Sequence, residues 1–226
     1  YKARVEALEA SKAGGNVYLT LLSGMKLAIT LRMQGQLQGT IDLCQDQFRL
    51  ANEKGVSQMP VVGWLQAIWG EALAETNQLA EALEKVRQGV TITERGEDIA
   101  MNGWSQLCLV RILFIHGNLD EAENILNKLE TISYKRNMPP YVVGLIFAWK
   151  ARIFVARDKL TAANQWVATH NLTFEGPITQ LNESQYLVLA RILLAKSQID
   201  ETQNLLQRLL GLAKASGRIS RIIEIL

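Results

Sequence analysis

The stretch CLVRILFIHGNLDEAENILNKL (108–129) contains two apolar runs separated by a polar hinge, HGN, at 116–118. After the hinge, apolar or small residues recur at the spacing i, i+3, i+4, i+7, namely Ala122, Ile125, Leu126 and Leu129. That spacing gives a helix one apolar face. Gly117 supplies a permissive backbone position where the first helix ends. The stretch therefore predicts a helix, a tight turn and a second helix.

The hinge pattern recurs along the chain as QGQLQGT (34–40), TNQLAEA (76–82), HGNLDEA (116–122), RDKLTAA (157–163) and SQIDET (197–202). Its apolar anchors are Leu37, Leu79, Leu119, Leu160 and Ile199, at separations of 42, 40, 41 and 39 residues. A regular period of this length is typical of stacked repeats, in which neighbouring units bury one continuous core.

The register holds on both sides of the anchor. Three residues after it stand small residues: Thr40, Ala82, Ala122, Ala163 and Thr202. Nine residues before it stand Ala28, Gly70, Val110, Ala151 and Ala190, and six before it the large residues Leu31, Leu73, Leu113, Phe154 and Leu193. Two before it are the turn formers Gly35, Asn77, Gly117, Asp158 and Ser197. Small residues let helices approach closely, and large ones fill the adjacent gap.

These patterns predict an all-α fold: a right-handed α-solenoid of about five helical hairpins, each of 39–42 residues, similar to a tetratricopeptide superhelix. We expect one repeat domain over 1–226, in which 1–13 and 219–226 are parts of incomplete units, so that the chain is a fragment of a larger protein. The long segment 170–183, which holds Pro177, predicts a short second helix followed by a loop in the fourth hairpin.

Composition and motifs exclude several classes of function. The formal net charge is +2, without a basic block that would bind phosphate backbones. Cys44 and Cys108 lie in helical apolar patterns and are expected to be buried thiols. No apolar stretch is long enough to span a membrane and no secretory signal is present, so we expect a cytoplasmic protein. His116 and His170 stand at helix ends, and no HExxH, GxSxG or GxGxxG motif occurs. We therefore expect no enzyme, no catalytic residue and no metal site.

The phrases GNVYLTLLSGMKLAITLRMQGQL (15–37) and LARILLAKSQIDETQNLLQRLLGLAKASGR (189–218) resemble the tetratricopeptide-like domain of MalT-type transcription activators. These are large ATP-dependent regulators of the LuxR family. The resemblance implies an N-terminal nucleotide-binding domain, this superhelical sensor and a C-terminal helix-turn-helix, with a small inducer or an inhibitory protein as partner. The chain has no GK dipeptide and no evident helix-turn-helix. It would then be the sensor alone, with ATP and DNA bound by the parent protein's other domains.

One register position carries the candidate site. Eight residues before the anchors stand Ile29, Glu71, Arg111, Arg152 and Arg191. Guanidinium groups suit carboxylates, phosphates and sugar hydroxyls, and the first helices of such repeats usually line the concave wall. Trp64 and Trp104, seven residues before Glu71 and Arg111, could hold a sugar ring or an apolar ligand.

Each of these features has an alternative explanation. The arginines could pair with acids of the next unit, and the tryptophans could be ordinary packing between helices. The candidate ligand-binding residues are Trp64, Glu71, Trp104, Arg111, Arg152 and Arg191. Two functions follow from them: an effector-sensing domain of a MalT-like regulator, or a tetratricopeptide-type scaffold that binds peptides.

Overall fold

A computed structural model describes residues 1–226 as twelve α-helices with no strand. The chain forms two compact units, Tyr1–Asn118 and Leu119–Leu226. The boundary lies at the hinge 116–118. Every predicted anchor is the first residue of a helix, and every predicted hinge separates two helices. The predicted all-α class of repeated helical hairpins is confirmed.

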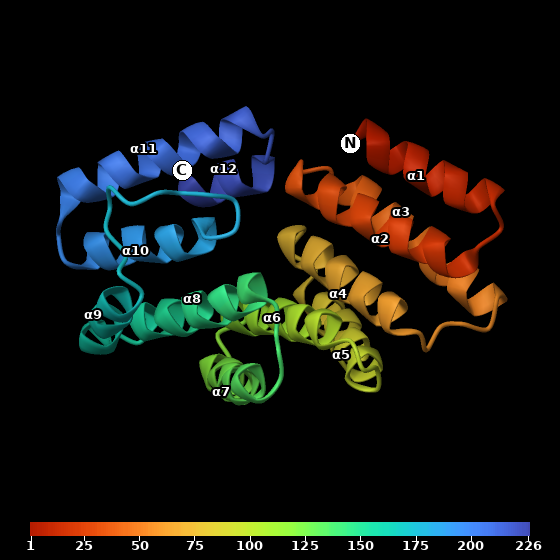
Figure 1. Cartoon of the computed structure of the whole chain (residues 1–226), viewed down its shortest axis with the longest axis horizontal. Coiled ribbons are helices and arrows are strands. Elements are labelled where there is room, and N and C mark those ends of the chain that lie inside the picture. Colours follow the sequence, from red (N-terminus) through yellow and green to blue (C-terminus); the bar gives the residue numbers. More distant parts are fainter. The chain divides into compact units, whose positions relative to one another are not determined.

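Unit 1 consists of six helices, coloured from red to green in Figure 1. They are α1 (Lys2–Ala13), α2 (Val17–Met33), α3 (Leu37–Glu53), α4 (Pro60–Glu75), α5 (Leu79–Glu94) and α6 (Ile99–Ile115). The pairs α2–α3 and α4–α5 are hairpins, and α1 packs on α2. We call the helix before each hinge a first helix. The first helices α2, α4 and α6 contact one another in succession, so they form one layer.

Unit 2 is also built of helical hairpins, but it begins with a helix that follows a hinge. Its helices are α7 (Leu119–Lys135), α8 (Pro140–Ala156), α9 (Leu160–Thr169), α10 (Glu183–Ala195), α11 (Ile199–Ala215) and α12 (Ile219–Ile225). The first helices α8 and α10 contact each other, α7 packs on α8, and α12 packs on α11. Because α12 follows the second helix of the fifth hairpin, it takes the place of the first helix of a sixth hairpin. The second helix of the fourth hairpin, α9, has only ten residues, and the segment 170–182 follows it without a helix, as predicted.

The five hinges share one backbone conformation. The residue two before each anchor has a positive φ: Gly35 73°, Asn77 63°, Gly117 81°, Asp158 55° and Ser197 60°. The N–H of the following residue donates to the carbonyl five residues earlier, as in Asn118 to Leu113 (2.9 Å) and Gln198 to Leu193 (2.9 Å). This bond and the left-handed residue define a Schellman ending, which satisfies carbonyls that the helix end would leave free.

The small register positions allow close packing between the two helices of a hairpin. A Cβ on Gly70 would lie 2.8 Å from the carbonyl oxygen of Ala82, the small residue three after the anchor. Nearer the other end of the same hairpin, a Cβ on Gly89 would lie 2.4 Å from the carbonyl oxygen of Gly63. Any side chain at these glycines would force α4 and α5 apart. The predicted role of small residues is therefore confirmed in this hairpin.

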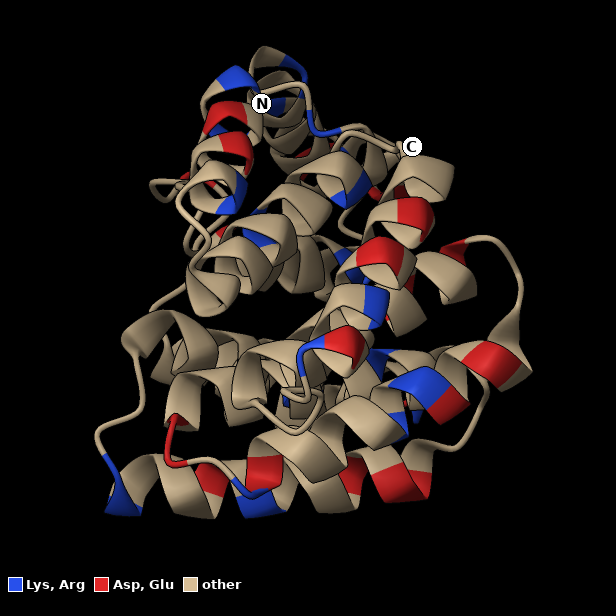
Figure 2. Cartoon of the chain, turned by 90° about the vertical axis from the view of Figure 1, so that its right-hand side faces the viewer, with Lys and Arg blue, Asp and Glu red and all other residues tan.

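Charged residues of both signs are spread over the helices (Figure 2). Cys44 and Cys108 are free and buried, as predicted. None of the helices combines the length and the apolar character that a membrane crossing requires.

Candidate functional site

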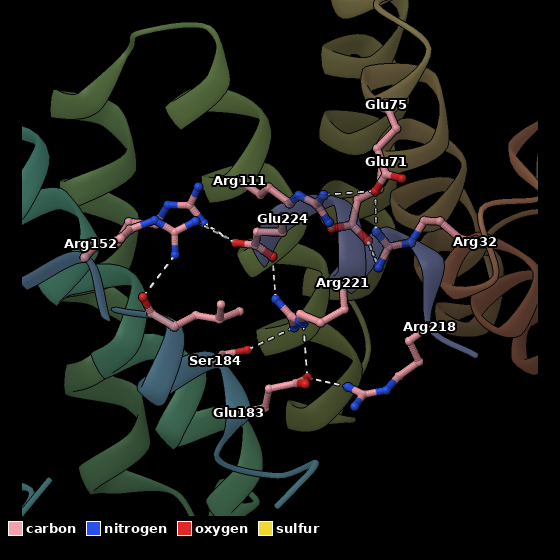
Figure 3. Close-up of polar contacts among 12 residues, drawn as sticks. Arg32, Glu71, Glu75, Arg111, Arg152, Glu183, Ser184, Arg218, Arg221 and Glu224 are labelled. Carbon is pink, nitrogen blue, oxygen red and sulfur yellow. Dashed lines mark hydrogen bonds and ion pairs between the residues drawn. The ribbon is translucent and has the colours of Figure 1, made fainter. Parts of the chain in front are cut away.

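Arg111 and Arg152 lie in ion pairs with carboxylates of other repeats (Figure 3). Arg191 does so as well. The pairs belong to two groups. The unit 1 cluster comprises Arg32, Glu71, Glu75 and Arg111. The unit 2 cluster comprises Arg152, Glu183, Arg191, Arg218, Arg221 and Glu224.

In the unit 1 cluster, Glu71 of α4 lies between Arg32 of α2 and Arg111 of α6. Its carboxylate oxygens are 3.0 Å from Nη2 of Arg32 and 3.3 Å from Nη1 of Arg111. Glu75, one turn further along α4, accepts from Nη1 of Arg32 at 2.8 Å and from Nη2 of Arg111 at 2.9 Å. Two carboxylates thus join two guanidinium groups across three helices, and the formal charges balance.

Glu71 is 6% exposed, so these neighbours decide whether its carboxyl group is protonated. Burial by itself would raise the pKa of Glu71. The charges of Arg32 and Arg111, together with hydrogen bonds from the Cys108 thiol and from Arg111, outweigh burial and lower the pKa below its ordinary value. Burial, with the adjacent Glu71 carboxylate, raises the pKa of Cys108, so this sulfur remains a thiol. The centre of unit 1 is therefore a fixed charged network containing a protonated thiol.

The unit 2 cluster joins α8, α10 and α12. One oxygen of Glu224, Oε1, accepts from Nη1 of Arg152 at 2.9 Å and from Nη2 of Arg191 at 3.1 Å. The other oxygen, Oε2, accepts from Arg221, one turn earlier on α12. Arg221 also donates from Nε to Glu183 at 3.1 Å, and the buried Arg218 donates to the same carboxylate. Each of these two carboxylates thus accepts from at least two guanidinium groups.

Aromatic residues stand on the same helices as the clustered charges. Trp64 of α4 and Trp104 of α6 are half-buried and lie against each other, with ring centroids 6.1 Å apart and an interplanar angle of 53°. The two predicted candidates are thus brought together. Trp149 was not among the predicted candidates, yet the guanidinium of Arg152 lies 4.8 Å from its ring centroid. That distance is within the range of a cation–π contact.

Some residues of each cluster were predicted from the sequence, and the others were not. The predicted charged candidates divide between the two units, with Glu71 and Arg111 in the first cluster and Arg152 and Arg191 in the second. Sequence reasoning did not identify their partners, which are Arg32, Glu75, Glu183, Arg218, Arg221 and Glu224. The alternative explanation, pairing with an acid of the next unit, holds for Arg191 and Glu224. Arg111 instead pairs with acids of the preceding repeat, and Arg152 pairs with Glu224 two repeats later. Binding of a ligand by these residues stays a prediction.

Comparison with known proteins agrees with this repeat architecture. The family model described as the MalT-like TPR region matches residues 1–226. Two solved structures of the nearly identical TPR-like repeats of a putative kinesin light chain from Podosopora anserina, one of them a substituted form, are similar in fold. Both are 25% identical in sequence and cover 87% of this chain and 95% of their own, with TM-scores of 0.59 and, for the substituted form, 0.60. No curated protein matches the chain.

Proposed function

The chain belongs to the family of MalT-like TPR regions, and from this premise we propose that it is the effector-sensing domain of a MalT-like transcription regulator. The effector would be a small inducer or an inhibitory protein. The signal would pass to a nucleotide-binding domain that uses ATP and to a helix-turn-helix domain that contacts DNA, both in the parent protein. A location in the cytoplasm is part of this proposal.

One observation carries the proposal: each cluster joins three helices of successive repeats through shared carboxylates. In unit 1, Glu71 and Glu75 join α2, α4 and α6. In unit 2, Glu224 joins α8, α10 and α12. A ligand that took one arginine from such a network would alter the pairing of several helices at once. Binding would then favour one arrangement of the repeats over another, which is a shift between populations.

In each unit, the effector would bind at the face of the first helices that carries the clustered arginines, which are Arg111 in unit 1 and Arg152 and Arg191 in unit 2. The tryptophans offer a second kind of contact, since Trp64 and Trp104 lie together in unit 1 and Trp149 lies beneath Arg152 in unit 2. Arginine provides directed hydrogen bonds and tryptophan provides apolar area, a combination found in sites for small polar ligands.

A peptide-binding scaffold is the second candidate. It is favoured by the likeness to the TPR-like repeats of the kinesin light chain protein, because repeats of this type generally bind other proteins. The arginines would then hold a carboxylate of the peptide.

A ligand screen tests the proposal. The melting temperature of the chain is measured with a panel of neutral and charged metabolites, and each positive result is repeated by calorimetric titration. We expect at least one metabolite, or a regulatory protein encoded near the parent gene, to bind and stabilise the fold. A parent gene that encodes neither a nucleotide-binding nor a DNA-binding domain would refute the proposal. A stable peptide partner without any response to metabolites would favour the scaffold.

A further inference from the structure

The two clusters share the plan of carboxylates that join guanidinium groups of several helices, but the groups meet in different ways. In unit 1, two guanidinium groups meet two carboxylates. In unit 2, the four arginines Arg152, Arg191, Arg218 and Arg221 share the carboxylates of Glu183 and Glu224. Two of these guanidinium groups, those of Arg152 and Arg191, meet at one oxygen of Glu224, and a pair of guanidinium groups directed at one oxygen is suited to bind an anion.

We propose that Arg152 and Arg191 form a binding site for the anionic group of a small ligand, a carboxylate or a phosphate, and that Glu224 occupies this site in the structure described here. The inference rests on the proposed function and names the chemical class of the effector. The Glu224 carboxylate contacts both arginines through one oxygen, at 2.9 and 3.1 Å. It therefore marks the position that an oxygen of the ligand would take.

The two arginines are held in place by contacts that do not depend on Glu224. Arg152 lies over the ring of Trp149, with its guanidinium carbon 4.8 Å from the centroid. Arg191 donates a further hydrogen bond from Nη1 to the carbonyl of Leu187, at 3.3 Å on the same helix. Because these contacts remain when Glu224 leaves, the arginines stay oriented, and less side-chain entropy is lost when a ligand binds.

Displacement of Glu224 is made easier by its second partner. Its Oε2 atom accepts from Arg221 of the same helix, a contact separate from those to Arg152 and Arg191. The carboxylate therefore keeps a charged partner after a ligand has taken its place beside Arg152 and Arg191. At 25% exposure the side chain also reaches water, so its release does not leave a buried charge unpaired.

The exchange would release one end of α12. Glu224 links this helix to α8 and α10, whereas Ile222 and Ile225 remain packed in the apolar cluster around Leu205 and Leu209. Arg218 would still pair with Glu183 of α10. The ligand would thus change how α12 is set against its neighbours without unfolding it, which would provide a route for the signal.

The test uses the whole chain with inorganic phosphate and succinate as probes, titrated by calorimetry at constant ionic strength. Glu224→Gln removes the internal competitor without removing an arginine. We expect it to bind a probe at least about fivefold more tightly than the wild type, because a negative charge a few ångströms away has gone. Arg152→Gln should bind the same probe roughly tenfold more weakly, since a charge-assisted hydrogen bond is lost.

Arg157→Gln is the matched control. Arg157 follows α8, has the same 25% side-chain exposure as Arg152, and pairs with Asp120 and Glu123 instead of Glu224. Its substitution removes the same charge and should change the affinity less than about twofold, because Arg157 is already paired with two other carboxylates near the surface. Circular dichroism melts check that each variant is folded. A misfolded Glu224→Gln chain would not bind a probe more tightly than the wild type, so misfolding cannot produce the expected rise in affinity.

Two results would overturn the inference: a Glu224→Gln chain that binds neither probe more tightly than the wild type, or equal weakening by Arg152→Gln and Arg157→Gln. Its failure is distinct from failure of the proposed function. An uncharged effector whose affinity is unchanged in Arg152→Gln would leave the sensing role intact and remove the anion site. A chain that binds no effector at all would refute both.

Discussion

Glu71→Gln should weaken the first unit far more than a surface substitution would. The carboxylate is buried and pairs with both Arg32 and Arg111. The glutamine keeps the shape of the side chain but removes the charge, and its NH2 group replaces one of the two oxygens that accept from Arg32 and Arg111. Arg32, whose side chain is only 11% exposed, then retains Glu75 as its remaining carboxylate.

Removing one partner of a buried ion pair costs about 3–5 kcal/mol. We expect a loss near the lower limit, about 3 kcal/mol, because Glu75 still pairs with both arginines and partly neutralises them. The assay is urea unfolding at pH 7, followed by far-UV circular dichroism and tryptophan fluorescence. Glu84→Gln, at an exposed position on α5, is the matched control, because it makes the same chemical change outside the cluster. It should change the free energy of unfolding by less than about 0.5 kcal/mol.

The pH dependence provides the sharper test. The folded pKa of Glu71 lies below its ordinary value of 4.5, so the unfolded chain binds this proton more readily than the folded chain. The stabilisation is therefore complete above the unfolded pKa and is lost as the pH falls through the folded pKa. The difference between wild type and Glu71→Gln should be constant from pH 7 to about pH 6 and should shrink below about pH 5. A variant as stable as the wild type at pH 7, or a difference that grows in acid, would refute this account of the cluster.

Three further predictions concern packing, the hinges and the thiols. In the same urea assay, Gly89→Ala should destabilise the chain by about 1–3 kcal/mol, because its Cβ would meet a backbone carbonyl. Gly39→Ala on α3, where a Cβ would have no atom within 4 Å, should stabilise the chain by up to about 1 kcal/mol. Ser197→Gly should raise stability by about 1 kcal/mol, since glycine adopts the positive φ without strain; a lower melting temperature would contradict this. Cys44 and Cys108, whose pKa values burial raises, should not react with a thiol reagent at pH 8 until urea unfolds the chain; rapid labelling of the folded protein would show that the thiols are accessible.

The hinges could be predicted fully from the sequence because their requirement is local. A left-handed residue is needed two positions before each anchor, and glycine, asparagine, aspartate or serine stands there every time. Glycine and asparagine tolerate that conformation well, so the signal is visible without knowledge of the rest of the fold. The division into two compact units was not predicted. Its boundary at 116–118 has the same sequence pattern as the other hinges, so nothing local distinguishes it.

The candidate site could be predicted only in part. Glu71 and Arg111 hold the same register position in adjacent repeats, and they pair in the structure. Arg32 and Glu224 stand at other positions, and their contacts depend on how far one helix is shifted along its neighbour. That shift is set by side-chain packing between helices and not by any pattern along one helix.

The occupation of a single register position by Glu71 in one repeat and by Arg111 in the next has a consequence for how such an array can change. Tandem duplication of the segment 99–139 would lengthen the run of arginines at this position from three to four, and the second copy of Arg111 would not have the Glu71 carboxylate in the preceding repeat. An array of nearly identical repeats can gain or lose a copy without such a mismatch. In this chain the ion pairs depend on which repeats are neighbours, so a longer array would need additional acidic residues as well as additional helices.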